Sequence, residues 1–178
     1  MKTFHLGKDT ARLAVLQRSE LISPTKKKIR KLFGRYLFTN FFSKNFIDTQ
    51  NIAKKYCEIM NVELYTFNNF LNNDMDILSI GSGIGGLEVL INANFKGSKF
   101  TFIEKNYISK KVKYGWDNNN SEAYNNIKLL KKFLIQNGVD NADFDIFDFD
   151  KDILPKKKFD LITSIYSLDY HYDFKFYY

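Results

Sequence analysis

The sequence predicts an α/β fold built on a parallel sheet, and three observations predict it. Four short apolar segments, at 76–80, 100–104, 144–147 and 159–163, have the composition of buried strands. Segments with a helical period lie between the first and second and between the second and third of them. A run of glycines follows the first segment directly. Strands that alternate with helices form parallel sheets through right-handed crossovers, so we expect that architecture for residues 73–178.

Residues 1–72 show helical periods and no strand period, which predicts an N-terminal helical extension or cap. Asp9 and Thr10 are candidate caps for a first helix that ends before Pro24. Asp48 or Thr49 can cap another helix. That helix places Ile52, Ala53, Tyr56 and Met60 on one face, and Leu64, Phe67 and Leu71 continue its period.

The sequence of residues 73–178 also predicts where the individual strands and helices lie. The strand at 76–80 runs into the glycines, and a helix follows from Gly85 to Asn94, with Leu87, Leu90 and Ile91 facing inward. After the strand at 100–104, Ser121 is the expected cap of a helix that ends near Gly138. The apolar stripe of that helix consists of Ala123, Ile127, Leu130 and Leu134.

Composition points to a globular protein, because 44% of the residues are hydrophobic and 26% are charged. The apolar runs are far shorter than the roughly 20 residues that cross a bilayer, so no membrane span is predicted. The N-terminal segment has no secretion-signal pattern. The single cysteine, Cys57, excludes an internal disulfide and fits the apolar face of a helix. We therefore expect a cytoplasmic location.

Basic residues crowd one short stretch of the chain, and this cluster has two interpretations. Its members are Lys26, Lys27, Lys28, Arg30, Lys31 and Arg35, followed by the aromatic residues Tyr36, Phe38, Phe41 and Phe42. The cluster could bind phosphates or an anionic membrane face, as a non-catalytic binding module would. Alternatively, it is the solvated face of a helix whose aromatic residues pack inward. The chain shows no target-recognition motif that would favour nucleic acid as a partner.

The glycine loop and a spaced acid predict a site for a cofactor that contains adenosine. Gly81-Ser-Gly83-Ile-Gly85 links a strand to a helix, where bare backbone can approach a ligand and the helix start offers N–H groups. Glu104 ends the second strand, from which a carboxylate can accept the hydrogen bonds of a ribose. Asp148 ends the third strand, with Phe149 beside it. Because Gly81, Gly83 and Gly86 also satisfy G-x-G-x-x-G, an NAD-dependent oxidoreductase remains an alternative.

The segments ILSIGSGIGGLEVL, FTFIEKN, FDIFDFD and FDLITSIYSLDYHYDF resemble the successive motifs of class I S-adenosylmethionine (SAM)-dependent methyltransferases. The last segment is most similar to that of sugar O-methyltransferases. The resemblance implies a Rossmann-like sheet with strand order 3-2-1-4 and SAM as cofactor. It also implies roles for individual residues: Gly81, Ser82, Gly83 and Gly85 line the methionine and ribose, Glu104 binds the ribose hydroxyls, and Asp148 and Phe149 address the adenine. Ser79 stands where many members of the family carry an acid, so a serine or a bridging water would bind the SAM amino group.

Methyl transfer to a hydroxyl needs a positioned acceptor and a base, and His171 is the candidate base. It follows the strand at 159–163, beside Asp169, Tyr170 and Tyr172, which could shape a pocket for a small acceptor such as a sugar. The alternative is a partly buried structural histidine. Ser164 and Ser167 lie in no G-x-S-x-G elbow, and the histidine and cysteine content predicts no metal site.

The family resemblance also implies a seven-stranded sheet, of which this chain supplies four strands. We therefore expect a fragment that retains the SAM site and has weak or no turnover. The strand at 159–163 would then form an exposed edge, through which the chain could pair with another copy.

Overall fold

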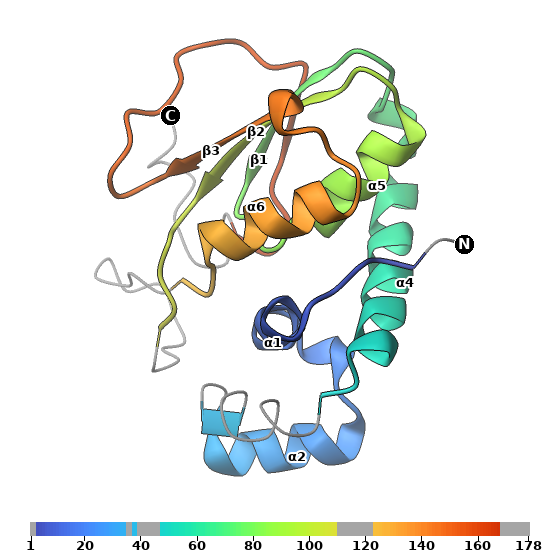
Figure 1. Ribbon diagram of the computed structural model, residues 1–178, viewed down its shortest axis with the longest axis vertical. Helices are drawn as coiled ribbons and strands as arrows, with labels where there is room; N and C mark the ends of the chain where they lie inside the picture. The colour runs from blue at the N-terminus through green and yellow to red at the C-terminus, as the bar shows by residue number, and fades with distance from the viewer. Residues whose placement is uncertain (1–2, 35–36, 39–46, 110–122, 168–178) are drawn as a thin grey trace.

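The computed structural model describes residues 3–34, 37–38, 47–109 and 123–167. The strands β1 (Asp76–Ile80), β2 (Lys99–Glu104), β3 (Phe144–Asp148) and β4 (Leu161–Thr163) form one sheet in the order β3-β2-β1-β4, and all their pairings are parallel (Figure 1). The predicted α/β class and strand order are therefore confirmed, and the architecture is Rossmann-like. β4 lies at one edge of this sheet. Pairing of that edge with another copy stays a prediction.

The described helices are α1 (Lys8–Gln17), α2 (Pro24–Phe33), α4 (Thr49–Phe67), α5 (Gly86–Asn94) and α6 (Ile127–Gln136), with short 3₁₀ turns at Ser19–Leu21, Asn68–Phe70 and Asn141–Asp143. α1, α4, α5 and α6 lie on the same side of the sheet and share its core, whereas α2 lies beyond α1, away from the sheet (Figure 1). α4 packs against α5, and α1 contacts both α4 and α6. The first 72 residues therefore share one core with the sheet.

That core follows from the alternation of side chains along the strands. Ile77, Phe100 and Phe102 are each at most 2% exposed and face the helices. Leu78, Ile80 and Ile103 point to the other face, where the partly buried Phe149, Leu154 and Phe159 cover them. Cys57 is buried in the helical side of the core, as predicted. In open parallel α/β sheets ligands bind outside the carboxyl ends of the strands, so the carboxyl edge of this sheet is where a site is expected.

The predicted starts of α1 and α6 are wrong, whereas that of α4 is confirmed. α1 begins at Lys8 with Gly7 as its N-cap, whereas Asp9 lies in the first turn and pairs with Arg12 at 3.5 Å. α1 also ends at Gln17, because Arg18 adopts an extended conformation; Pro24 then begins α2. By contrast, the predicted cap of α4 is confirmed, since the Asp48 carboxylate accepts the Asn51 N–H at 3.1 Å.

α6 begins at Ile127 and not near Ser121, which lies outside the described residues. Asn126 is its cap, because the Asn126 side chain accepts the Leu129 N–H at 3.1 Å. Ala123 cannot join the helix, since its carbonyl accepts the Ser109 N–H at 2.8 Å in a short antiparallel bridge. Leu130 and Leu134 of the predicted stripe are fully buried, together with Phe133.

β4 is shorter than predicted and begins at Leu161. Asp160 joins β1 in a different way: its carboxylate accepts the Asp76 N–H at 2.8 Å, and its N–H donates to the Asp76 carbonyl at 2.9 Å. Phe159 instead packs on the smaller core.

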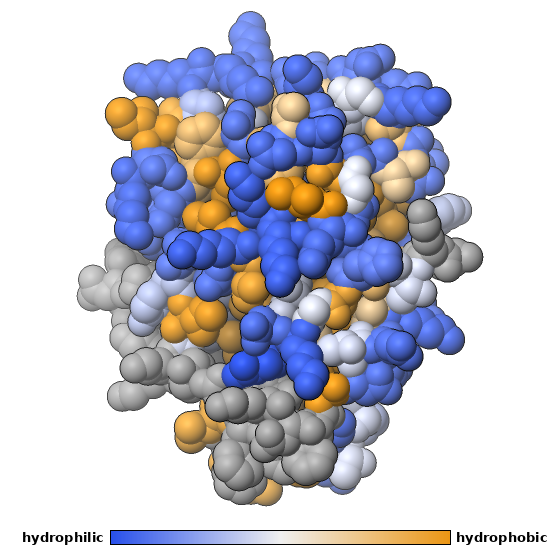
Figure 2. All heavy atoms as spheres, viewed as in Figure 1, coloured by the Kyte–Doolittle hydropathy of each residue, from blue (hydrophilic) through white to orange (hydrophobic). Residues whose placement is uncertain are grey.

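The surface seen in Figure 2 is mostly hydrophilic, with hydrophobic atoms in small areas between the polar side chains. On α2, Lys26, Lys28 and Lys31 are exposed, while Phe38, which follows this helix, is 3% exposed and belongs to the core. In the part of the chain that the structure describes, no helix has both the length and the apolar character needed to cross a bilayer.

Candidate functional site

A pocket of about 370 Å³ lies at the carboxyl ends of β1 and β2, a volume in the range of small-molecule sites. The glycine loop and the ends of the strands form one wall. The other wall comes from the N-terminal helices, through Gln17, Arg18, Glu20, Tyr56 and Glu63. Residues from before and after position 72 therefore build one site together.

The glycine loop has the backbone conformation that its sequence predicts. Gly81 and Gly83 have φ angles of 67° and 69°, in the left-handed region that glycine adopts without strain. A Cβ on Gly83 would lie 2.7 Å from the Gln17 Oε1, so this glycine also admits the end of α1. The Asn125 side-chain amide donates to the Gly83 carbonyl at 2.8 Å. The loop is thus bonded to Asn125 and packed closely against the end of α1.

Glu104 ends β2 as predicted and is anchored on the glycine loop. Its Oε1 accepts the Ser82 hydroxyl at 2.7 Å and the Gly83 N–H at 3.2 Å. The side chain is 4% exposed, and burial raises its pKa to about 7, although the Ser82 hydrogen bond acts in the opposite direction. The carboxylate therefore has a defined orientation at the pocket, where ligand hydroxyls could donate to it.

The other predicted cofactor residues divide into two groups. Ser79, Gly81, Ser82, Gly83, Glu104 and Phe149 all line the pocket. Gly85 and Asp148 are not among the lining residues. Gly85 faces α6, since a Cβ there would lie 2.9 Å from Leu130 and Leu134 side-chain atoms. Asp148 pairs with Glu104 in the sheet register, but its carboxylate accepts the Asp150 N–H at 3.3 Å and contacts the Lys151 ammonium at 3.4 Å.

Glu88 is a pocket residue that sequence reasoning missed. It lies in the first turn of α5, is 2% exposed and lines the pocket. The Ser79 hydroxyl donates to its Oε1 at 2.5 Å. Burial raises the pKa of Glu88 to about 7, with the Ser79 hydrogen bond opposing the shift. One signal was available in the sequence: Glu88 is the single charged residue in the otherwise apolar run from Gly86 to Ile91, and a helix that is apolar on all sides must bury any acid that it carries.

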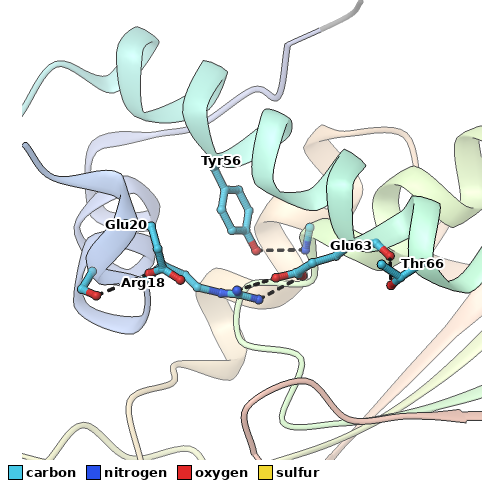
Figure 3. Close-up of polar contacts among 7 residues, drawn as sticks. Arg18, Glu20, Tyr56, Glu63 and Thr66 are labelled. Carbon is cyan, nitrogen blue, oxygen red and sulfur yellow. Dashed lines mark hydrogen bonds and ion pairs between the residues drawn. The ribbon is translucent and has the colours of Figure 1, made fainter.

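Arg18 and Glu63 form a nearly buried ion pair on the opposite wall (Figure 3). The guanidinium donates to both carboxylate oxygens, at 2.6 and 3.1 Å, and its carbon lies 5.1 Å from the centre of the Tyr166 ring. Burial alone lowers the pKa of Arg18, but the hydrogen bonds and charge of Glu63 outweigh it, so the net shift is upward. Arg18 thereby connects the N-terminal helices to the segment that follows β4.

Tyr56 joins α4 to the start of α5. Its hydroxyl oxygen accepts the Gly86 N–H at 3.2 Å (Figure 3), and the side chain is 2% exposed. Burial raises the pKa of Tyr56 well above its ordinary value, so the phenol stays neutral. One of the N–H groups that a helix start offers to an anion is therefore already bonded within the protein.

No family model, curated protein or solved structure matches this chain. The function must therefore be argued from the chemistry of the pocket.

The candidate base, His171, lies outside the described residues, as do Asp169, Tyr170 and Tyr172. Its role remains a prediction. Tyr166 and Ser167, just before them, line the pocket, so the chain approaches the site at this point. Among the described residues, no group of three or more histidine, cysteine, aspartate or glutamate side chains is arranged to hold a metal ion.

Replacing Arg18 with methionine is expected to destabilise the protein by about 2 kcal/mol. The substitution leaves Glu63 charged in a poorly hydrated position, and the exposure of about a sixth of each side chain keeps the cost below that of a fully buried pair. Urea unfolding measures the change. The double variant Arg18→Met/Glu63→Met should recover most of the loss; equal or greater loss in the double variant would contradict this account.

Proposed function

We propose that this chain binds SAM and forms the cofactor-binding part of a methyltransferase that acts on a small hydroxylated molecule, with a sugar as the expected class. The observation that supports this most is the carboxylate of Glu104, which the Ser82 hydroxyl and the Gly83 N–H orient at the carboxyl edge of the sheet. A carboxylate at this place is suited to accept the paired hydroxyls of a ribose. Phe149 lines the same pocket and offers an apolar surface for the adenine.

The charges around the pocket favour a cationic cofactor. Among the residues that the structure describes, the lining contains the carboxyl groups of Glu20, Glu63, Glu88 and Glu104 and two cations, Arg18 and Lys105. An excess of acidic groups concentrates positive ligands and repels negative ones. SAM carries a net positive charge, because it has a sulfonium and an ammonium group but one carboxylate. The lining suits that charge.

A dinucleotide fits the same features less well. Its pyrophosphate would lie at the start of α5, as in other dinucleotide sites. There, the Gly86 N–H already donates to Tyr56, and the Glu88 carboxyl occupies the first turn. Because a carboxylate beside a pyrophosphate is repulsive, the alternative of an NAD-dependent oxidoreductase is disfavoured.

When bound, SAM supplies a methyl group that is already strongly electrophilic. The chain's own residues then have to bind and orient the cofactor. Glu104 accepts hydrogen bonds from the ribose hydroxyls, and the glycine loop lets the backbone approach the ligand. We propose His171 as the base that takes the proton of the acceptor hydroxyl. Arg18 and Tyr166 also line the pocket, with the Arg18 guanidinium carbon 5.1 Å from the centre of the Tyr166 ring.

Calorimetric titration of the full chain tests the cofactor. We expect SAM and S-adenosylhomocysteine to bind and NADH not to bind. Glu104→Gln should weaken S-adenosylhomocysteine by roughly 10- to 100-fold, since hydrogen bonds to a charged group contribute about 1.5–3 kcal/mol.

Glu58→Gln removes the same charge from an exposed residue of α4 that does not line the pocket, and it is the matched control. Binding of NADH in place of S-adenosylhomocysteine would reject the proposed function in favour of the oxidoreductase.

A further inference from the structure

Ser79 and Glu88 form a hydrogen-bonded pair inside the pocket. The proposed function assigns no part of the ligand to this pair. Ser79 is 1% exposed near the end of β1, and Glu88 is 2% exposed in the first turn of α5. The hydroxyl of Ser79 donates to the Glu88 carboxyl, and both residues line the pocket. The pair therefore places a carboxyl oriented by a hydroxyl against the space that a ligand would fill.

Three of the acidic residues that line the pocket differ in how far their charge is compensated. Glu63 is neutralised by the bidentate contact with Arg18. Glu104 accepts from a hydroxyl and a backbone N–H of the glycine loop. Glu88 has the Ser79 hydroxyl and its own backbone N–H, and no cation contacts it among the described residues. An ionised carboxyl buried in this way is costly until a positive group meets it.

We propose that Glu88, held in place by Ser79, binds the ammonium group of the cofactor's amino-acid part. This inference rests on the proposed function and adds to it the residue that recognises one end of the ligand. An ammonium is compact and has three donors, so it can donate to the buried carboxylate oxygens of Glu88. The negative charge that meets the ammonium comes from Glu88 on α5, because the corresponding residue of β1 is the neutral Ser79.

The neighbours of Glu88 suit the rest of an amino acid. Arg18 and Glu63 are close enough for their charges to shift the pKa of Glu88. Arg18 lines the pocket, and a guanidinium has five N–H donors, of which Glu63 accepts two. A group that carries an ammonium and a carboxylate on the same carbon would thus face an acid on one side and a guanidinium on the other.

Three ligands that share adenosine and a neutral sulfur test this inference on the full chain. They are S-adenosylhomocysteine, its analogue without the α-amino group, and methylthioadenosine, which lacks the whole amino acid. In calorimetric titrations at pH 8, Glu88→Gln should weaken S-adenosylhomocysteine by roughly 10- to 100-fold and change the other two by less than about twofold. Glu104→Gln is the matched control and should weaken all three ligands, since all carry the ribose.

Equal losses for all three ligands in Glu88→Gln would overturn the inference, because the residue would then act on the fold of the pocket. A wild-type chain that binds none of the three would overturn the proposed function itself, so the two failures are distinguishable. Ser79→Ala is the second variant and keeps the charge. It should weaken S-adenosylhomocysteine by a few-fold and leave the deamino analogue unchanged; loss of both alike would also overturn the inference.

Discussion

Replacing Glu88 with glutamine is expected to remove a large part of the loss of stability that the ligand-free protein shows as the pH rises from 4.5 to 8. Burial raises the pKa of Glu88 from 4.5 to about 7 in the folded chain. Between these two values the unfolded chain has released the proton and the folded chain still holds it, so the free energy of unfolding falls as the pH rises. The difference corresponds to about 3 kcal/mol.

The measurement is urea unfolding of the wild type and of Glu88→Gln at several pH values. The two pH profiles should diverge by about 3 kcal/mol across this window and run parallel above it. Glu104→Gln should behave in the same way, because burial raises the pKa of Glu104 to about 7 as well. Arg18, Glu63, Tyr56 and Glu104 are the other ionisable groups that interact electrostatically with Glu88, and all four remain in the wild type and in Glu88→Gln. Glu58→Gln, at an exposed site, is the control. Parallel profiles throughout would show that Glu88 is ionised at little cost and would contradict the role of its burial.

This result has a meaning for function as well as for stability. If the acid served only to stabilise the fold, Glu88→Gln would lower the free energy of unfolding at every pH. An acid kept for a cationic ligand instead lowers the stability of the ligand-free protein at neutral pH, a cost often seen at binding sites. Stability that is recovered in Glu88→Gln at pH 8, together with weaker binding of S-adenosylhomocysteine, would separate the two roles.

Gly86→Ala is expected to destabilise the protein by about 3 kcal/mol. A Cβ on Gly86 would lie 2.5 to 2.7 Å from the Cε1, Oη and Cζ atoms of Tyr56, closer than such atoms can pack. The ring has little room to move, because Tyr56 is 2% exposed and its centroid lies 5.6 Å from that of Phe4 and 6.3 Å from that of Phe133. Thermal and urea unfolding both measure the loss.

A double-mutant cycle with Tyr56→Leu identifies the cause. Leucine lacks the ring atoms that the new Cβ would meet, so in that background Gly86→Ala should be neutral or stabilise α5 by up to about 1 kcal/mol, the helix preference of alanine over glycine. If the two substitutions were simply additive, the contact with Tyr56 would not be the reason for a glycine at this position.

The sequence by itself predicted the elements whose signals are local. β1 and β2 are short apolar segments, the left-handed Gly81 and Gly83 stand where the loop needs them, and Glu104 ends its strand as expected. The order of the sheet followed from the family resemblance, and its parallel pairings from the alternation of strands and helices. Local signals failed for the start of α6, where the predicted place of Ala123 in the helix was overridden by the pairing of its carbonyl with the Ser109 N–H.

Only the tertiary structure decided which side chains meet in the pocket. Gly86 is 30 residues from Tyr56, Glu63 is 45 residues from Arg18, and neither pair leaves a periodic trace in the sequence. Glu88 follows Ser79 by only nine residues, but the spacing alone does not identify it as a ligand-binding acid. It becomes a candidate because α4 packs against α5 and Glu88 is buried in the folded chain. Local periodicity reports which face of an element is apolar, whereas the cost of a buried charge depends on what the rest of the chain places around it.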